Sequence, residues 1–121
     1  MQEALNRTSL SVIVITKNEA ANIAACLASV AFADELIVLD SGSTDDTVSI
    51  AAQMGAKVMI AQDWLGFGKQ KNRALDLATQ EWVLSIDADE RVTPELALEI
   101  KQVIQAGEHA LFDMPRRTSF C

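Results

Sequence analysis

Two carboxylates stand two residues apart in Asp87-Ala88-Asp89, directly after the apolar run Trp82–Ile86. At the end of a buried strand, one of them could orient a ribose hydroxyl while the other binds Mg²⁺ or Mn²⁺. These hard cations favour carboxylate oxygens and often keep water and substrate phosphates as further ligands. The tripeptide alone is more typical of a solvated turn before a helix, where acidic residues are favourable. The preceding apolar run makes us favour the metal-binding interpretation.

A second polar segment, Asp40–Asp46, also follows an apolar run. Asp40 could accept hydrogen bonds from a base or a ribose. The residues after it are types that favour helix N-termini. We therefore interpret Asp40 as a ligand contact and the next polar residues as helix caps: Ser43, Thr44 and Asp45.

Three cationic side chains fall within five residues of an acidic chain: Lys69, Lys71 and Arg73. If this segment opens a helix, free backbone N–H groups would add to a phosphate-binding site. The alternative is a solvated basic helix face, which we expect to account for at least one of the three. The segment is not a P-loop, because no glycine stands five residues before Gly68.

The other candidate residues favour structural roles. His109, the single histidine, is expected to be exposed near a turn, so no catalytic triad can be argued. Trp64 and Phe67 could pack against a base or sugar, although burying a loop is the commoner role.

Composition limits the class of protein. The 121 residues, half of them apolar, suit one domain over residues 1–121 with a hydrophobic core. The net charge of −7 argues against a nucleic-acid binder, because neutralising phosphates needs surplus Lys and Arg. Cys26 and Cys121 show no metal-ligand spacing and fit a reduced, cytoplasmic chain. We find no signal peptide or membrane-spanning run, and peripheral attachment at the inner face of a membrane stays open.

Strand and helix patterns alternate along the chain, which predicts an α/β fold with a parallel sheet and right-handed crossovers. The predicted strands are Leu10–Ile15, Glu35–Leu39, Lys57–Ala61, Trp82–Ile86 and Leu111–Pro115. The predicted helices run from Asn18 to about Val30, from Ser43 or Thr44 to Met54, from Gly68 to about Thr79, and from Pro94 to just before Gly107.

Ligands bind an open parallel sheet outside the carboxyl ends of its strands. Polar residues follow three of the predicted strands there, and this convergence is stronger evidence than any single motif. They are Thr16, Lys17, Asn18 and Glu19 after the first strand, Asp40 to Asp46 after the second, and Asp87 to Arg91 after the fourth.

The combination resembles glycosyltransferase family 2. The matching segments are Ser11–Glu19, Ile37–Asp45 and Asp87–Asp89, in family order. The resemblance implies a GT-A fold, in which a Rossmann-like, mostly parallel sheet is flanked by helices. Gly68–Leu75 and Met114–Arg117 look like the branch that adds glucose or a similar sugar to lipopolysaccharide core.

The resemblance also implies roles for individual residues. Thr16 and Asp40 would line the nucleoside pocket, Arg73 would reach the base or phosphates, Asp87 would meet the ribose, and Asp89 would bind the metal. The complete set of expected nucleotide-sugar contacts is Thr16, Asn18, Glu19, Asp40, Lys69, Lys71, Arg73 and Asp87, with Asp89 as ligand of Mg²⁺ or Mn²⁺.

Family enzymes of this kind invert the anomeric carbon by direct displacement, so the partners implied are a nucleotide-diphosphate sugar and a glycan or lipid-linked acceptor. The catalytic base is expected beyond Cys121. We therefore interpret the chain as a truncated donor-binding part that is inactive alone. Ser41 departs from the pattern, because many members carry a second Asp there.

Two other functions remain open on sequence. A nucleotidyltransferase usually needs a glycine-rich loop after the first strand, where this chain has Thr16–Glu19. A noncatalytic α/β nucleotide-binding module would need no catalytic base.

Overall fold

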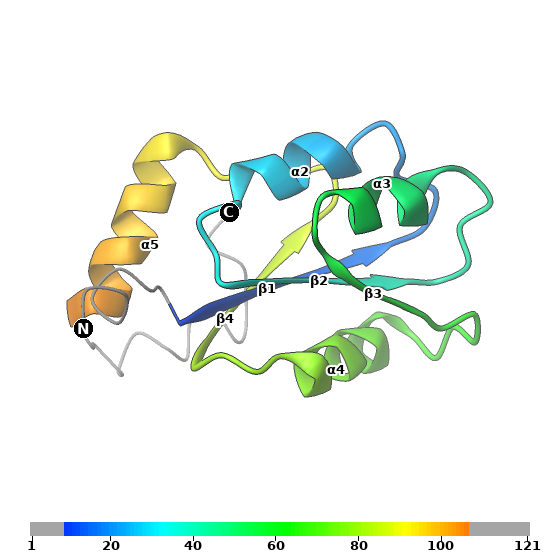
Figure 1. Ribbon diagram of the computed structural model, residues 1–121. Coiled ribbons are helices and arrows are strands. Elements are labelled where there is room, and N and C mark those ends of the chain that lie inside the picture. The colour runs from blue at the N-terminus through cyan, green and yellow to red at the C-terminus, as the bar shows by residue number, and fades with distance from the viewer. Residues whose placement is uncertain (1–8, 107–121) are drawn as a thin grey trace.

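The computed structural model describes residues 9–106, in which helices cover both faces of a parallel sheet (Figure 1). Its strands pair in the order β3-β2-β1-β4, all parallel. The strands are β1 (Leu10–Thr16), β2 (Glu35–Asp40), β3 (Lys57–Ile60) and β4 (Trp82–Asp87). The helices are α2 (Ile23–Ser29), α3 (Thr47–Gln53), α4 (Phe67–Leu77) and α5 (Pro94–Ala106).

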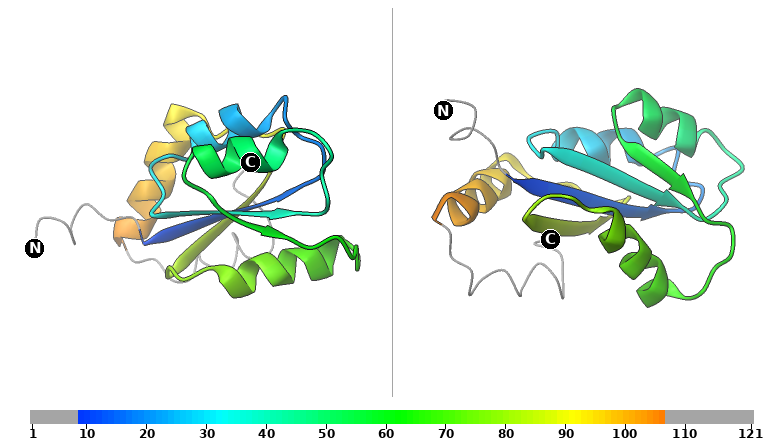
Figure 2. Two further views of the ribbon diagram at one scale, coloured as in Figure 1. Left: turned by 45° about the vertical axis from the view of Figure 1, so that its right-hand side comes forward. Right: turned by 60° about the horizontal axis from the view of Figure 1, so that its bottom comes forward.

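The sheet divides the core into two layers, with α2, α3 and α5 on one face and α4 on the other (Figure 2). Successive side chains of a strand point to opposite faces. Val12 and Val14 therefore join the larger apolar cluster, which includes Leu27 of α2 and Ile100 of α5. Ile13 belongs to the smaller cluster on the α4 side, together with Ile37, Leu39 and Ala74.

Strand register brings the predicted functional segments together. Thr16 pairs with Asp40, Ile15 with Asp87, and Asp40 with Ile60. The carboxyl ends of all four strands therefore meet at one edge of the sheet, on the right in Figure 1. This confirms the predicted parallel α/β architecture and places the candidate site at that edge.

Two predicted helix starts are wrong. Asn18 does not begin a helix: its φ of 55° lies in the left-handed region, which asparagine tolerates, and α2 begins at Ile23. Likewise α3 begins at Thr47, after both Ser43 and Thr44. These polar residues instead hydrogen-bond between the loops after β1 and β2, as described below. Three predictions fall outside the described residues: the strand Leu111–Pro115, the helix end at Gly107 and the exposed position of His109. Within residues 9–106, no helix is long and apolar enough to cross a membrane.

At the opposite edge of the sheet, the buried carboxylate of Glu35 joins three segments. It accepts hydrogen bonds from Ser11 Oγ (2.6 Å), Lys57 Nζ (2.5 Å) and both Thr79 N and Oγ1 (2.9 and 3.1 Å). Burial alone would raise the pKa of Glu35, but the hydrogen bonds from Lys57, Ser11 and Thr79 outweigh it and lower the pKa to about 2. The ionised carboxylate therefore stabilises the amino edge of the sheet.

We expect the stability contributed by Glu35 to depend on pH. Its folded pKa of about 2 lies below the ordinary value of 4.5, so the contribution is complete above the unfolded pKa and is lost as pH falls towards 2. This shift corresponds to a contribution on the order of 3 kcal/mol. Urea unfolding at a series of pH values should show that Glu35→Gln removes this dependence. Glu81→Gln, an exposed carboxylate at the same edge, is the matched control, and identical pH profiles for the two variants would contradict the assignment.

Candidate functional site

Asp40, at the end of β2, is a fully buried carboxylate whose hydrogen bonds all come from the chain itself. Oδ1 accepts hydrogen bonds from Thr16 Oγ1 and Ser43 Oγ, both at 2.6 Å. Oδ2 accepts from the backbone N–H groups of Gly42 (3.0 Å) and Ser43 (2.7 Å). Burial raises the pKa of Asp40, and the hydrogen bonds from Ser43, Thr16 and Gly42 lower it by more. Because a carboxylate has about four acceptor positions, the end of β1 and the loop after β2 together saturate Asp40.

The loops after β1 and β2 form one polar unit above Asp40. Asn18 N donates to Ser43 Oγ (2.7 Å), and Thr44 N donates back to Asn18 Oδ1 (2.8 Å). Lys17 Nζ donates to the carbonyl of Gly42 (2.9 Å). The backbone N–H of Glu19 reaches Thr47 Oγ1 at 2.8 Å, so the start of α3 is attached as well. These contacts fix the positions of Asn18 and Glu19 relative to β2, and both residues lie at the predicted edge.

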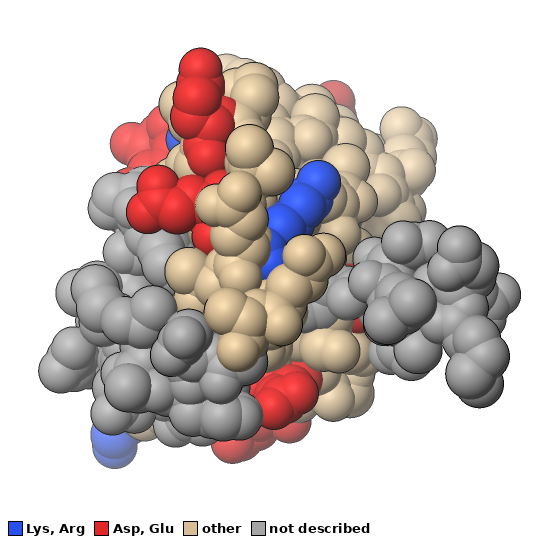
Figure 3. Space-filling view, turned by 90° about the vertical axis from the view of Figure 1, so that its left-hand side faces the viewer, with Lys and Arg blue, Asp and Glu red and all other residues tan. Residues whose placement is uncertain are grey.

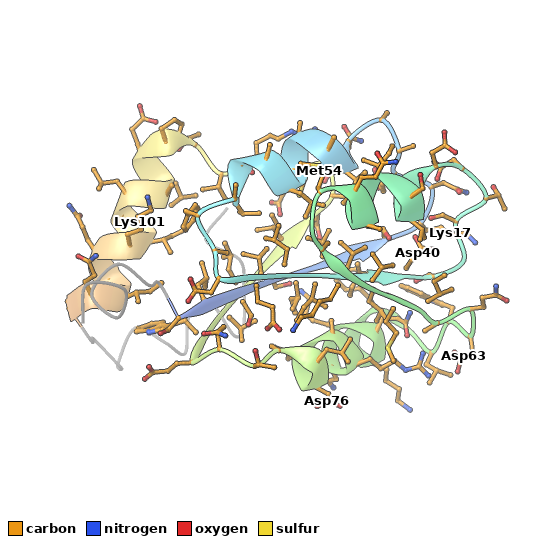
Figure 4. The ribbon with its side chains drawn as sticks, in the orientation of Figure 1. Lys17, Asp40, Met54, Asp63, Asp76 and Lys101 are labelled. Atoms are coloured by element: carbon orange, nitrogen blue, oxygen red, sulfur yellow. The ribbon has the colours of Figure 1, made fainter. Side chains whose placement is uncertain are left out.

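A pocket of about 330 Å³ opens beside this polar unit, lined by Lys17, Ser41, Gln62 and Trp64. Ser41 is buried, and its Oγ accepts a hydrogen bond from Gln70 Nε2 of α4 (3.1 Å). Lys17 and Asp40 lie at the same edge as Asp63, whereas Lys101 lies at the far end of the molecule (Figure 4). The pocket is therefore assembled from three strand ends and has both polar and aromatic walls.

Three of these pocket-lining residues, Lys17, Ser41 and Gln62, were not among the predicted contacts. Lys17 and Ser41 belong to strand-end segments that the sequence did single out, so their position was available although their role was not. Gln62 follows β3, whose carboxyl end carries no acidic motif, and only the pairing of β3 with β2 brings it to the site.

The three cations predicted to bind phosphate do not converge. Arg73 makes an ion pair with Asp63 (2.8 Å) and a hydrogen bond to Gln70 Oε1 (2.8 Å). The hydrogen bond from Arg73 lowers the pKa of Asp63, and the same bond raises the pKa of Arg73. Lys71 Nζ lies 5.0 Å from the centre of the Phe67 ring. Successive helix residues are rotated by about 100°, so Lys69 and Lys71 lie on opposite sides of α4.

Asp87 and Asp89 present exposed side chains at the end of β4, with the buried Ala88 between them. A tight turn holds this segment: Asp87 N donates to Glu90 Oε1 (2.8 Å), and Glu90 N donates to the Asp87 carbonyl (2.9 Å). The Glu90 side chain therefore stabilises the turn in which it lies. The flanking carboxylates of Asp87 and Asp89 face solvent on the edge where Thr16 and Asp40 end their strands.

The carboxylates of Asp87 and Asp89 suit a cation for which the protein supplies only some of the ligands. Within residues 9–106, no group of three His, Cys, Asp or Glu side chains is placed to hold a metal ion. Mg²⁺ commonly binds through one or two carboxylates and completes its shell with water and substrate phosphates. Asp89 with its neighbour Asp87 fits that mode, and a cage of protein ligands does not.

Comparison with known proteins matches most of the chain to one family. The model of "Glycosyl transferase family 2" matches residues 11–121. An uncharacterized glycosyltransferase of Rickettsia felis is 52% identical over 95 residues, which are 78% of this chain and 33% of that protein. The lipopolysaccharide core biosynthesis glycosyltransferase LpsC of Rhizobium meliloti is 32% identical over 82% of this chain and 38% of its own length.

A solved structure shows the same fold. The mannosyltransferase PcManGT from Pyrobaculum calidifontis, in complex with GDP-Man and Mn²⁺, superposes with a TM-score of 0.67 at 29% identity, over 80% of this chain and 32% of that one. The expected GT-A fold is thereby confirmed. The chain spans about a third of the length of the proteins it matches.

We expect Asp40→Asn to destabilise the chain by roughly 2–3 kcal/mol, because an amide NH₂ group would then face N–H or O–H donors in a buried position. Asp46→Asn is the matched control, since Asp46 is exposed and makes no side-chain cap hydrogen bond to α3. Urea unfolding measures both variants. Equal free energies of unfolding would show that the hydrogen bonds of Asp40 do not hold the two loops.

Proposed function

This chain belongs to glycosyl transferase family 2. From that premise we propose that it is the donor-binding part of an enzyme that transfers the sugar of a nucleotide-diphosphate sugar. The transfer goes to a glycan or lipid-linked acceptor and inverts the anomeric carbon. One observation carries the proposal: three polar features meet at the carboxyl edge of the sheet, where open α/β sheets bind nucleotides. They are the pocket beside Trp64, the hydrogen-bonded loops around Asp40, and the exposed Asp87-Ala88-Asp89 turn.

The nucleoside end of the donor is assigned to the pocket beside Trp64, which offers an aromatic face and polar groups that can read a base. In this proposal Thr16 and Asp40 support the pocket wall from below, because Asp40 holds Gly42 and Ser43 in place. Asn18 and Glu19 border the same loops. Asp87 orients a ribose hydroxyl, and Arg73 with Lys69 and Lys71 contributes positive charge for the diphosphate.

Asp89, with Asp87 beside it, would hold a divalent cation. When bound, Mn²⁺ or Mg²⁺ supplies stabilisation for the charge that develops on the departing diphosphate. Two observations support the assignment: both carboxylates are exposed at the donor edge, and the PcManGT complex contains Mn²⁺ together with a nucleotide sugar. The role of this chain's residues is to bind and orient the donor.

No described residue is assigned as the catalytic base. The matched region covers about a third of the relative's own length, and we place the base and the acceptor site in the part of the full-length protein that corresponds to the unmatched remainder. The name of LpsC supports a lipopolysaccharide-core acceptor. Such an enzyme would work on the cytoplasmic side of a membrane. Family membership favours sugar transfer over the two alternatives, nucleotidyl transfer and a noncatalytic nucleotide-binding module.

The proposed function is tested by calorimetry with UDP and GDP in parallel. We expect the chain to bind one of them more tightly with Mn²⁺ than with chelator, because ligands that share a site through the diphosphate are coupled, typically by about 1–3 kcal/mol. Asp89→Asn should remove this enhancement, whereas Glu95→Gln, an exposed carboxylate on α5, should keep it. Equal nucleotide binding with Mn²⁺ and with chelator in the native chain would refute the metal assignment.

A second prediction concerns the ion pair of Arg73 with Asp63. Asp63 competes with a diphosphate for the guanidinium, so Asp63→Asn should tighten nucleotide binding and Arg73→Ala should weaken it by roughly tenfold at low salt. Lys69→Ala and Lys71→Ala should have smaller effects, Lys71 least because its ammonium lies over Phe67. Titration of the four variants with the nucleotide diphosphate measures these affinities. Unchanged affinity in Arg73→Ala, Lys69→Ala and Lys71→Ala would identify the cluster as a solvated helix face.

A further inference from the structure

The segment from the end of β3 to the start of α4 exposes an unusual amount of apolar surface. Within the described part of the chain, five of the six exposed large apolar side chains come from residues 59–67, here called the apolar loop. The five are Met59 (45% exposed), Ile60 (54%), Trp64 (53%), Leu65 (50%) and Phe67 (51%). Scattered exposed apolar residues are ordinary, whereas a contiguous group of them usually marks an interaction surface.

The apolar loop is shaped to present these side chains outward. Gly66 has a φ of 102°, a conformation that L side chains rarely adopt, and it turns the chain between Leu65 and Phe67. The Trp64 and Phe67 rings meet at a centroid distance of 6.4 Å, so they form a small aromatic cluster on the surface. Shallow hollows along β3 and α4 extend the apolar surface past Met59 and Ile60 to Leu77.

Two lysines lie beside the apolar loop on a chain of net charge −7. Residues 57–73 hold four basic residues and one acidic residue, but Lys57 is paired with Glu35 and Arg73 with Asp63. Lys69 and Lys71 therefore carry the positive charge at the loop, and Asp76 lies at the far side of the hollow. Lys71 extends over the Phe67 ring, and Lys69 is exposed one turn into α4. The opposite end of the molecule shows more acidic than basic surface (Figure 3).

We propose that the apolar loop docks this chain on an anionic lipid bilayer surface. Tryptophan and phenylalanine side chains are suited to the interface between headgroups and acyl chains, and lysines extend to the headgroups while their stems stay on apolar surface. Lys69 and Lys71 favour an anionic partner, because each basic residue near such a surface adds attraction. A second copy of the chain would instead bring two positively charged faces together.

Docking in this way would orient the donor site. Trp64 belongs both to the apolar loop and to the wall of the pocket, so the pocket mouth would lie close to the bilayer surface. A lipid-linked acceptor would then approach the carboxyl edge from the membrane. The docking proposal stands apart from the proposed catalytic function, because vesicle binding requires no nucleotide and no sugar transfer.

The test is sedimentation with vesicles of phosphatidylcholine alone or mixed with phosphatidylglycerol, without nucleotide. We expect binding to the mixed vesicles that weakens with salt, and a loss of at least about tenfold in the Leu65→Ser/Phe67→Ser variant, which removes two apolar anchors. Lys69→Gln/Lys71→Gln should weaken binding by about fivefold for each lysine. Leu98→Ser is the matched control, since Leu98 on α5 is equally exposed (57%) outside the loop.

A separate readout excludes misfolding and other occupants. Trp82 is buried, so a shift of tryptophan emission to shorter wavelength on adding vesicles reports Trp64. Native-like thermal unfolding of the Leu65→Ser/Phe67→Ser variant shows that lost binding comes from the loop itself. The proposal is overturned if native chain and variant bind equally, if anionic lipid has no effect, or if the loop is covered without lipid by a second copy, seen as a dimer that this variant dissociates.

Discussion

The carboxylate of Asp40 is the interaction on which the carboxyl edge of this sheet depends. A fully buried charge is costly unless it is hydrogen-bonded throughout, and Asp40 meets that requirement with two hydroxyl and two backbone N–H donors. Those donors belong to two different strand ends, so satisfying one charge fixes both. The loop after β2 takes its shape from this requirement, and the loop after β1 is then attached through Asn18 and Lys17.

This constraint explains why the edge can be polar and still hold its shape. Polar loops at a sheet edge have little apolar surface to bury, so packing alone would leave them mobile. Here the hydrogen bonds around Asp40 continue to Ser41, whose N–H donates to the Thr16 carbonyl (2.9 Å) and whose Oγ accepts from Gln70 of α4. Gln70 in turn accepts from Arg73. One connected set of hydrogen bonds therefore links the pocket beside Trp64 to α4, the helix that carries Lys69, Lys71 and Arg73.

The sequence was sufficient for the parallel α/β fold and for the edge of the sheet at which the predicted polar segments meet. Alternating β-branched runs and helix caps predicted the order of strands and helices, and the rule for parallel sheets then predicted which edge would bind a ligand. Helix starts failed at Asn18 and Ser43, because a side chain that can cap a helix can equally bond to another loop, and only the fold brings that loop near. The position of Gln62 in the pocket and the ion pair of Arg73 with Asp63 were also not predicted. Both depend on where the fold places the loop after β3.

Strand β2 carries a buried carboxylate at each end, and the two serve different purposes. Glu35 accepts from groups on β1, β3 and the segment before β4, so it secures the order of the strands at the edge away from the site. Asp40 accepts from Thr16 at the end of β1 and from Gly42 and Ser43 in the loop after β2. The two charges lie at opposite ends of the six-residue strand, five residues apart, and apolar packing on both faces of the sheet separates them, so they act independently. Glu35 therefore secures the strand order at the amino edge, and Asp40 holds the loops in place at the carboxyl edge, where β1, β2 and β4 end together.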